Sequence, residues 1–266
     1  MKNNGPPIKT VYYEDESKDE FSSAVITPKT IDETWQYLKK GFSWQVKRFV
    51  SYRLFAPIIG YFYCRIRLGW RLKNKKAFRR LKDKKGGYFV YGNHTQQTAD
   101  AFIPSFVSFP KSTYVIVHAN NVSMPYLGRI TPYLGALPLP DTLHAARNFK
   151  RAVHTRFYQG NAVFIYPEAH IWPYCIRIRN FPAASFRYPV DLDAPSFCVT
   201  TTYQRRKFWK TPRAVTYVDG PFYPDKTLPI KERVQTLRDE VYAKMQERSK
   251  LSNCEYIRYE RKGEAK

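Results

Sequence analysis

The chain has 266 residues, 43% of them hydrophobic, which is enough for one sizeable α/β domain with appendages. This composition excludes a chain that is disordered throughout. The four cysteines, Cys64, Cys175, Cys198 and Cys254, are widely and irregularly spaced, which argues against a disulfide framework or structural zinc and favours reduced thiols. Because no apolar run follows the first lysine, we expect no secretory signal.

The formal net charge is +23, and more than half of this excess lies in residues 41–85, which hold fourteen basic residues and one acidic residue. The same segment is rich in aromatic residues: Phe42, Trp44, Phe49, Tyr52, Phe55, Tyr61, Phe62, Tyr63 and Trp70. A basic and aromatic segment is typical of proteins that bind either nucleic acid or an anionic membrane.

Residues 1–29 form a lead-in with an acidic cluster between Glu14 and Glu20, in which no catalytic motif is visible. The sequence Thr30-Ile31-Asp32-Glu33 matches a helix capping box, in which the threonine side chain and the glutamate three residues later bind free backbone amides. It predicts a short helix that begins there and ends near Gly41.

An apolar stretch, Leu54 to Cys64, follows between two arginines. It is much shorter than the ~20 residues that cross a bilayer as a helix, and Pro57 and Gly60 weaken the helix further. With the basic residues that follow it, each contributing ~1 kcal/mol near an anionic bilayer, the stretch is predicted to lie in the membrane interface. The alternative is a solvated helix whose apolar side packs on the rest of the protein.

From residue 86 onward the pattern is that of an α/β domain. Strands are predicted at residues 88–91, 113–117, 162–166, 197–203 and 214–218. Helices are predicted at residues 147–159 and 231–250; in the second, apolar residues recur every three or four positions after Pro229.

Asn93-His94 follows the first of these strands, and Asp100 lies six positions after the histidine. A neutral imidazole can take a proton from an attacking hydroxyl, and a nearby carboxylate can fix its tautomer and stabilise the imidazolium. A second motif, Tyr166-Pro167-Glu168-Ala169-His170, follows the apolar run 162–165. The two motifs therefore indicate a catalytic edge where two strands end.

Together the two motifs resemble those of the glycerolipid acyltransferase family, over roughly residues 86–200. Its first block is an Asn-His with an Asp a few residues on, and its third is similar to Phe-Pro-Glu-Gly. Three features depart from its pattern. Five residues instead of four separate His94 from Asp100; the second block aligns best on residues 135–141, ending in Asp141 where arginine is common; and the third has Ala169 for glycine and Ile171 where arginine often stands.

The resemblance implies an α/β fold with a mixed sheet flanked by helices, like that of glycerolphosphate acyltransferases, preceded by a basic amphipathic helical membrane-binding segment. We expect a lead-in at 1–29, a membrane-associating region at 30–85 and the acyltransferase domain at 86–266. The implied reaction is transfer of a fatty acyl group, from acyl-CoA or acyl-carrier protein, to a lysolipid hydroxyl in phospholipid biosynthesis. The leading acceptor is 1-acylglycerol 3-phosphate.

In this interpretation His94 is the general base and Asp100 orients its ring. Further residues are predicted to shape or contact the substrate: Asn93, Tyr166, Pro167 and Glu168. Since the family's usual arginines are missing, Arg177 and Arg179 are predicted to bind the acceptor phosphate. Backbone amides after the first strand, or a nearby basic side chain, are expected to stabilise the oxyanion.

No cofactor or metal is implied, and we expect a peripheral protein on the cytoplasmic face of the cell membrane. Two alternatives remain. The same histidine–aspartate site could serve a thioesterase or lipid hydrolase, with water as the acceptor. The basic and aromatic region could bind nucleic acid, although no helix-turn-helix, RNP-like or zinc-finger motif supports it and nucleic acid is not an expected partner.

Overall fold

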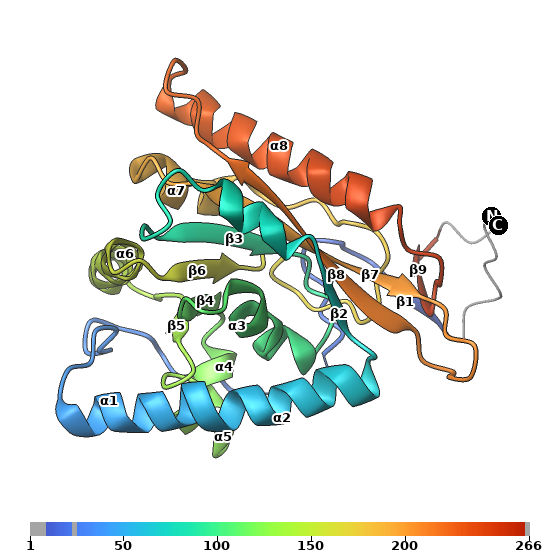
Figure 1. The fold of residues 1–266 in the computed structure, drawn as a ribbon, viewed down its shortest axis with the longest axis horizontal. Helices are drawn as coiled ribbons and strands as arrows, with labels where there is room; N and C mark the ends of the chain where they lie inside the picture. Colours follow the sequence, from blue (N-terminus) through green and yellow to red (C-terminus); the bar gives the residue numbers. More distant parts are fainter. Residues whose placement is uncertain (1–8, 23–25, 264–266) are drawn as a thin grey trace.

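The computed structural model describes residues 9–22 and 26–263 of the chain. A seven-stranded sheet forms its centre, with strand order β2-β8-β7-β3-β6-β4-β5 (Figure 1). The strands are β2 (Arg71–Lys73), β3 (Tyr88–Gly92), β4 (Thr113–Val117), β5 (Ala136–Pro138), β6 (Ala162–Ile165), β7 (Ser196–Gln204) and β8 (Arg213–Phe222). All neighbours are parallel except β7 and β8, so the expected mixed sheet is confirmed.

Helices cover both faces of this sheet, which explains why the sequence of strand β3 is apolar throughout. Its residues alternate between the faces: Phe89 and Tyr91 belong to the core under α6 (Leu143–Tyr158) and α8 (Ile230–Ser249), whereas Tyr88 and Val90 belong to the opposite core. Such a strand has no solvent-facing side, which is typical of parallel sheets. The predicted helices at 147–159 and 231–250 correspond to α6 and α8.

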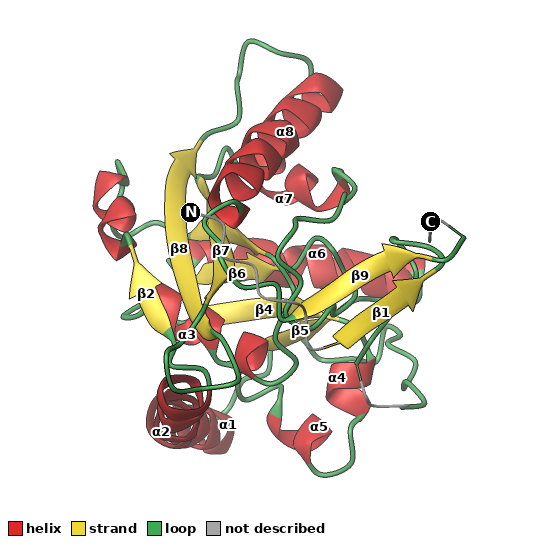
Figure 2. Cartoon of the chain, turned by 90° about the vertical axis from the view of Figure 1, so that its right-hand side faces the viewer, coloured by secondary structure: helices red, strands yellow, loops and turns green. Residues whose placement is uncertain are grey.

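The second face is covered by a helical segment, residues 42–67, and by α3 (Ile103–Ser108). The segment comprises α1 (Phe42–Phe49), a π-helical stretch at Val50–Phe55, α2 (Ala56–Phe62) and a second π-helical stretch at Tyr63–Arg67. It runs as one rod along the bottom of Figure 1 and is seen almost end-on in Figure 2. In the described part of the chain, no helix combines the length and the apolar character needed to cross a bilayer.

The helix continues through Pro57 and Gly60, two residues that are unfavourable inside a helix. Pro57 lies in the first turn of α2, directly after a π-helical stretch in which the Ala56 amide donates to Ser51, five residues back. A proline is tolerated where the regular ladder of hydrogen bonds is already interrupted. Gly60 is buried, and a Cβ atom there would lie 2.6 Å from the Phe102 ring, so glycine permits the close approach of helix and core.

The prediction of a helix that begins at Thr30 is wrong, since residues 30–41 form turns and irregular backbone. The Asp32 carboxylate accepts hydrogen bonds from the Thr34 amide (3.0 Å) and hydroxyl (2.6 Å), and the Ile31 amide donates to Asp141 (2.7 Å). Local side-chain bonds and a contact 110 residues away in sequence therefore replace the helical ones.

A second, two-stranded sheet joins the two ends of the described chain, where β1 (Lys9–Tyr13) pairs in parallel with β9 (Ile257–Arg261). It lies beyond the carboxyl ends of β3 and β6, on the right in Figure 1. Strand β2, from the predicted 30–85 region, pairs with β8, so the central sheet also includes residues before position 86. The remaining short helices are α4 (Asn120–Ser123), α5 (Leu127–Ile130) and α7 (Arg187–Asp191), with 3₁₀ turns at Lys75–Arg80, Ala99–Ala101 and Ala184–Phe186.

Candidate active site

The two sequence motifs meet at one edge of the sheet. Strands β3 and β6 are parallel neighbours in which Tyr91 is paired with Ile165. His94 and Glu168 each lie three residues beyond this pair, so the two chains leave the sheet side by side. The carboxyl edge of parallel strands is the usual place for a site in an open α/β sheet.

His94 and Asp100 form a directly hydrogen-bonded pair. The imidazole Nδ1 lies 2.8 Å from Asp100 Oδ2, and that oxygen also accepts the backbone amides of Thr95 (3.0 Å) and Gln96 (2.9 Å). A turn completed by the Asp100 amide bonding to the Gln96 carbonyl folds the carboxylate back, so the additional residue between them is accommodated. Asp100 is buried and His94 is partly exposed, with 17% of its side chain accessible, so Nε2 is the nitrogen left for a substrate.

Two predicted site residues hold this pair in place. The Tyr166 ring stacks on the His94 ring, with 4.3 Å between centroids and 16° between planes, and its hydroxyl donates to the Asp100 carbonyl (2.8 Å). Burial strongly raises the pKa of Tyr166, so the phenol stays protonated. Asn93 is buried and exchanges two hydrogen bonds with the backbone of Thr201 on β7. Direct contact of either residue with a substrate stays a prediction.

Glu168 links the two motifs from the other side. One carboxylate oxygen accepts the His94 backbone amide (3.0 Å) and the Arg179 guanidinium (3.1 Å), and the other accepts the Arg179 amide (2.9 Å). Both partners of this ion pair are almost completely buried. Removing one partner of a buried ion pair typically destabilises a protein by about 3–5 kcal/mol. Because Glu168 also accepts the His94 amide, this pair fixes the position of the histidine backbone. The buried Pro167 belongs to the same loop.

The expected oxyanion donors are not free in this arrangement. The backbone amides of His94, Thr95 and Gln96, directly after β3, all donate to the carboxylates of Glu168 and Asp100. These three amides are therefore not available to an oxyanion, and the alternative donor, a nearby basic side chain, stays a prediction. The carboxylates of Glu168 and Asp100 use these donors to hold the arrangement around His94.

Arg177 and Arg179, the predicted phosphate ligands, are both engaged within the protein. The guanidinium of Arg179 bonds to Glu168 and to the His170 carbonyl, and it lies 4.8 Å from the Trp172 ring centroid. Arg177 forms an ion pair with Glu16 and lies over the Tyr13 and Trp172 rings. A phosphate at Arg177 would have to compete with a carboxylate, and the role of both arginines stays a prediction.

Sequence reasoning missed the acidic lead-in as part of this region. Besides the Glu16 contact, the Glu20 carboxylate accepts the Ile171 amide (3.1 Å) and lies 3.4 Å from the His170 ring nitrogen. The Trp172 indole donates to the Asp19 carbonyl (2.8 Å). The available signal was the opposite charge of the acidic lead-in and the basic residues after the third block. More than 150 residues separate the two segments in sequence, so no local pattern joined them.

Asp141, which stands where the family commonly has an arginine, has a structural partner. It lies three residues after the end of β5, at the same edge of the sheet, and its carboxylate accepts the Ile31 amide. Its own amide donates to the Ile31 carbonyl (3.0 Å). The second block of this chain therefore anchors the N-terminal segment.

The buried cysteines nearest the site are poor nucleophiles. Burial, with a smaller contribution from Asp100, raises the pKa of the Cys64 thiol to about 12. Burial and the neighbouring Glu168 raise the pKa of Cys175 to about 12. Because the reactive form is the thiolate, neither is activated for acyl transfer. Within residues 9–22 and 26–263, no group of three or more metal-ligating His, Cys, Asp or Glu side chains comes together.

Ala169 carries backbone strain that can be tested directly. It stands where the family commonly has glycine, and its φ is +61°, in the left-handed region that disfavours side chains. We expect Ala169→Gly to raise the free energy of unfolding by up to about 1 kcal/mol, since relief of strain exceeds the additional entropy of the unfolded chain. Chemical denaturation measures this, with Ala183→Gly (φ −78°) as the control that should lose stability. Destabilisation by both changes would contradict the strain.

A solved structure has a similar fold. The crystal structure of the 1-acyl-sn-glycerophosphate (LPA) acyltransferase PlsC from Thermotoga maritima matches 81% of this chain and 86% of its own, with a TM-score of 0.52 and 16% sequence identity. This chain has the fold of that acyltransferase. The resemblance in the two motifs is thus confirmed at the level of the fold. No protein-family model and no curated protein sequence matches the chain.

Proposed function

We propose that this protein is an O-acyltransferase that moves a fatty acyl group from a thioester to the hydroxyl of a glycerolipid. The observation that carries this proposal is the hydrogen-bonded His94–Asp100 pair at the carboxyl end of the central strand, in a fold similar to that of a lysophosphatidate acyltransferase. Glu168, which follows the neighbouring strand β6, accepts the His94 backbone amide.

In the proposed reaction, His94 Nε2 takes the proton of the acceptor hydroxyl as its oxygen attacks the thioester carbonyl. The carbon–oxygen bond forms, the carbon–sulfur bond breaks, and the thiolate leaves with the proton that the imidazolium returns. Asp100, bonded to Nδ1, keeps Nε2 unprotonated before the attack and stabilises the imidazolium afterwards. The substrate hydroxyl attacks directly, so no enzyme nucleophile is needed.

The proposed acceptor is supported by the similar structure and by the overall charge. We propose a lysolipid acceptor, with 1-acylglycerol 3-phosphate as the leading candidate, and acyl-CoA or acyl-carrier protein as the donor in phospholipid biosynthesis. The similar structure is that of a 1-acyl-sn-glycerophosphate acyltransferase, which supports this acceptor. The net charge of +23 favours anionic substrates.

We also propose that the protein binds the cytoplasmic face of the cell membrane as a peripheral protein. Support comes from the helical segment 42–67, whose outer side carries apolar residues that are each more than half exposed: Phe49, Phe55, Ile58, Ile59 and Phe62. Its buried residues, Tyr52, Gly60 and Cys64, are in contrast directed towards the sheet. An exposed apolar stripe beside basic residues is typical of interfacial helices.

Removing two residues of this stripe is expected to weaken vesicle binding strongly. For Phe55→Ser/Ile59→Ser we predict a loss of roughly 10²-fold or more in partitioning onto anionic vesicles, because full burial of each side chain contributes about 1.5–3 kcal/mol. Sedimentation with vesicles measures this. Leu143→Ser/Tyr158→Ser, which removes two exposed apolar residues of α6, is the matched control. Equal binding of both variants would show that the stripe does not contact the membrane.

The function itself is tested with purified protein, a labelled acyl thioester and a panel of lysolipids. Labelled product lipid is the result expected of an acyltransferase. Labelled free fatty acid in place of product lipid would assign the same site to a thioesterase and overturn the proposal. Turnover that does not depend on His94 would do the same.

A further inference from the structure

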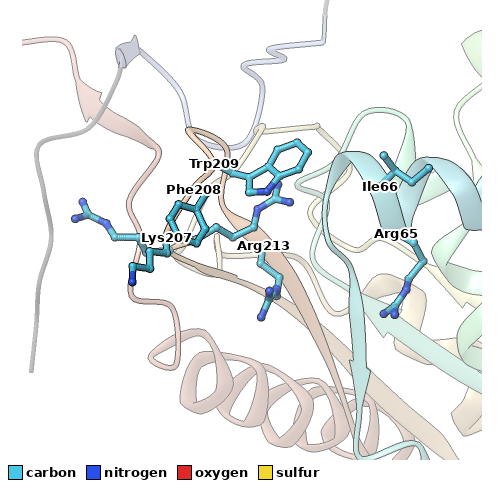
Figure 3. A pocket seen from close by; sticks show the side chains of 8 residues that line it. Arg65, Ile66, Lys207, Phe208, Trp209 and Arg213 are labelled. Carbon is cyan, nitrogen blue, oxygen red and sulfur yellow. The ribbon is translucent and has the colours of Figure 1, made fainter.

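A basic pocket lies where the helical segment meets the hairpin between β7 and β8. Its volume is about 580 Å³. Figure 3 shows Arg65 and Ile66, from the end of the helical segment, on one side of it and Phe208, Trp209 and Arg213, from the hairpin, on the other. None of its lining residues belongs to the site around His94.

The pocket is strongly positive and has no internal counter-charge. Its lining contains five cations and no acidic residue: Arg65, Arg205, Arg206, Lys207 and Arg213. In the described part of the chain, none of these five forms an ion pair with a carboxylate. Arg177 and Arg179, the arginines predicted to bind phosphate, are in contrast paired with carboxylates. This concentration of unpaired charge attracts an anion.

The hairpin holds Arg206, at the centre of this group of cations in sequence, through its guanidinium. The guanidinium of Arg206 donates to the Thr211 carbonyl (2.9 Å) and to the Arg67 carbonyl (3.0 Å), and it lies 4.9 Å from the Trp209 ring centroid. Burial, together with the nearby charge of Arg213, lowers the pKa of Arg206. The Nε atom of Arg213 is buried without a hydrogen-bond partner among the described residues. Beside crowded cations without a carboxylate partner, a bound anion contributes charge and accepts hydrogen bonds from the guanidinium groups that line the pocket.

Several guanidinium groups around one volume favour a ligand with several charged oxygens. A phosphomonoester carries up to two charges on three terminal oxygens and accepts bidentate hydrogen bonds from arginine. The rim of the pocket is apolar, since Ile66, Phe208 and Trp209 are all more than half exposed. Ile66 extends the exposed stripe of the helical segment, so the pocket opens onto the same surface as the proposed membrane contact. A lipid headgroup fits this combination better than a dissolved anion.

We propose that this pocket binds the phosphomonoester headgroup of a membrane lipid, as in phosphatidate. The proposal rests on the proposed membrane contact for the source of the ligand, but not on acyl transfer. It assigns Lys207 and Arg213 to headgroup recognition, while Phe208 and Trp209 enter the interface beside the bound lipid.

The test compares the full-length protein with two charge-matched double variants. Lys207→Gln/Arg213→Gln removes two cations of the pocket. Arg80→Gln/Lys210→Gln removes two exposed cations that do not line it. Binding is measured on neutral vesicles and on vesicles with phosphatidate or phosphatidylglycerol, adjusted to equal surface potential. Lys207→Gln alone, at an exposed position, and thermal unfolding of each variant control for folding.

We expect the pocket variant to bind phosphatidate vesicles about ten-fold more weakly than the control variant, and both to bind phosphatidylglycerol vesicles equally. Equal loss on both vesicle types would reduce the pocket to non-specific surface charge and overturn the proposal. Coenzyme A or an oligonucleotide that binds more tightly than phosphatidate vesicles, with its binding lost in the pocket variant, would assign the pocket to another ligand. Because acyl transfer is not measured, a failure here is distinct from a failure of the proposed reaction.

Discussion

His94→Ala is expected to lower the turnover of acyl transfer by about 10²–10⁴ while the fold is retained, because loss of a general base is worth that much in rate. The structure gives a reason for retained folding. Asp100 keeps two backbone amides as donors, from Thr95 and Gln96, so its buried carboxylate is not left without partners. Steady-state kinetics with a labelled acyl thioester, together with thermal unfolding, measure both effects.

His170→Ala is the matched control for this substitution. It removes a histidine from the loop of the third block whose ring faces Glu20 and not the His94–Asp100 pair. We expect it to retain most of the turnover. A folded His94→Ala protein with turnover close to that of the wild type would show that the proton is taken by another group, and the mechanism would have to be abandoned.

The strands and the position of the two motifs at their ends could be predicted because the signals are local. The apolar runs at 88–91 and 162–165 identify two parallel strands, and the residues that follow them identify one edge of the sheet. The six-residue spacing of His94 and Asp100 did not by itself place them together. The turn that does so depends on amides of the intervening residues, which any side chain could supply.

Long-range contacts account for what the sequence did not reveal. The capping box at Thr30 was outweighed by the bond that the Ile31 amide donates to Asp141, and no local pattern encodes a partner so distant in sequence. The pairing of β1 with β9 and the contacts of Glu16 and Glu20 have the same origin. Counting basic residues also treated Arg177 and Arg179 as free cations, although the fold pairs both with carboxylates.

Asp100→Asn is expected to reduce turnover by a similar factor, about 10²–10⁴, through its effect on the imidazole. If the amide oxygen takes the place of Oδ2, the hydrogen bonds survive but the charge that stabilises the imidazolium is lost. If the amide nitrogen faces Nδ1, it donates to the ring and leaves the proton on Nε2, which then cannot act as a base. Asp141→Asn is the matched control, since that carboxylate binds a backbone amide at the same edge of the sheet.

A double-mutant cycle separates this role from a general loss of structure. Because Asp100 acts through the ring, Asp100→Asn should cause almost no further loss of turnover in the His94→Ala protein, although each single variant is severely impaired. Independent losses that multiply would mean that Asp100 contributes to the reaction by a route that does not pass through His94. A silent Asp100→Asn in the wild-type background would show that the hydrogen bond at 2.8 Å is not needed for turnover. The histidine would then act without an orienting carboxylate.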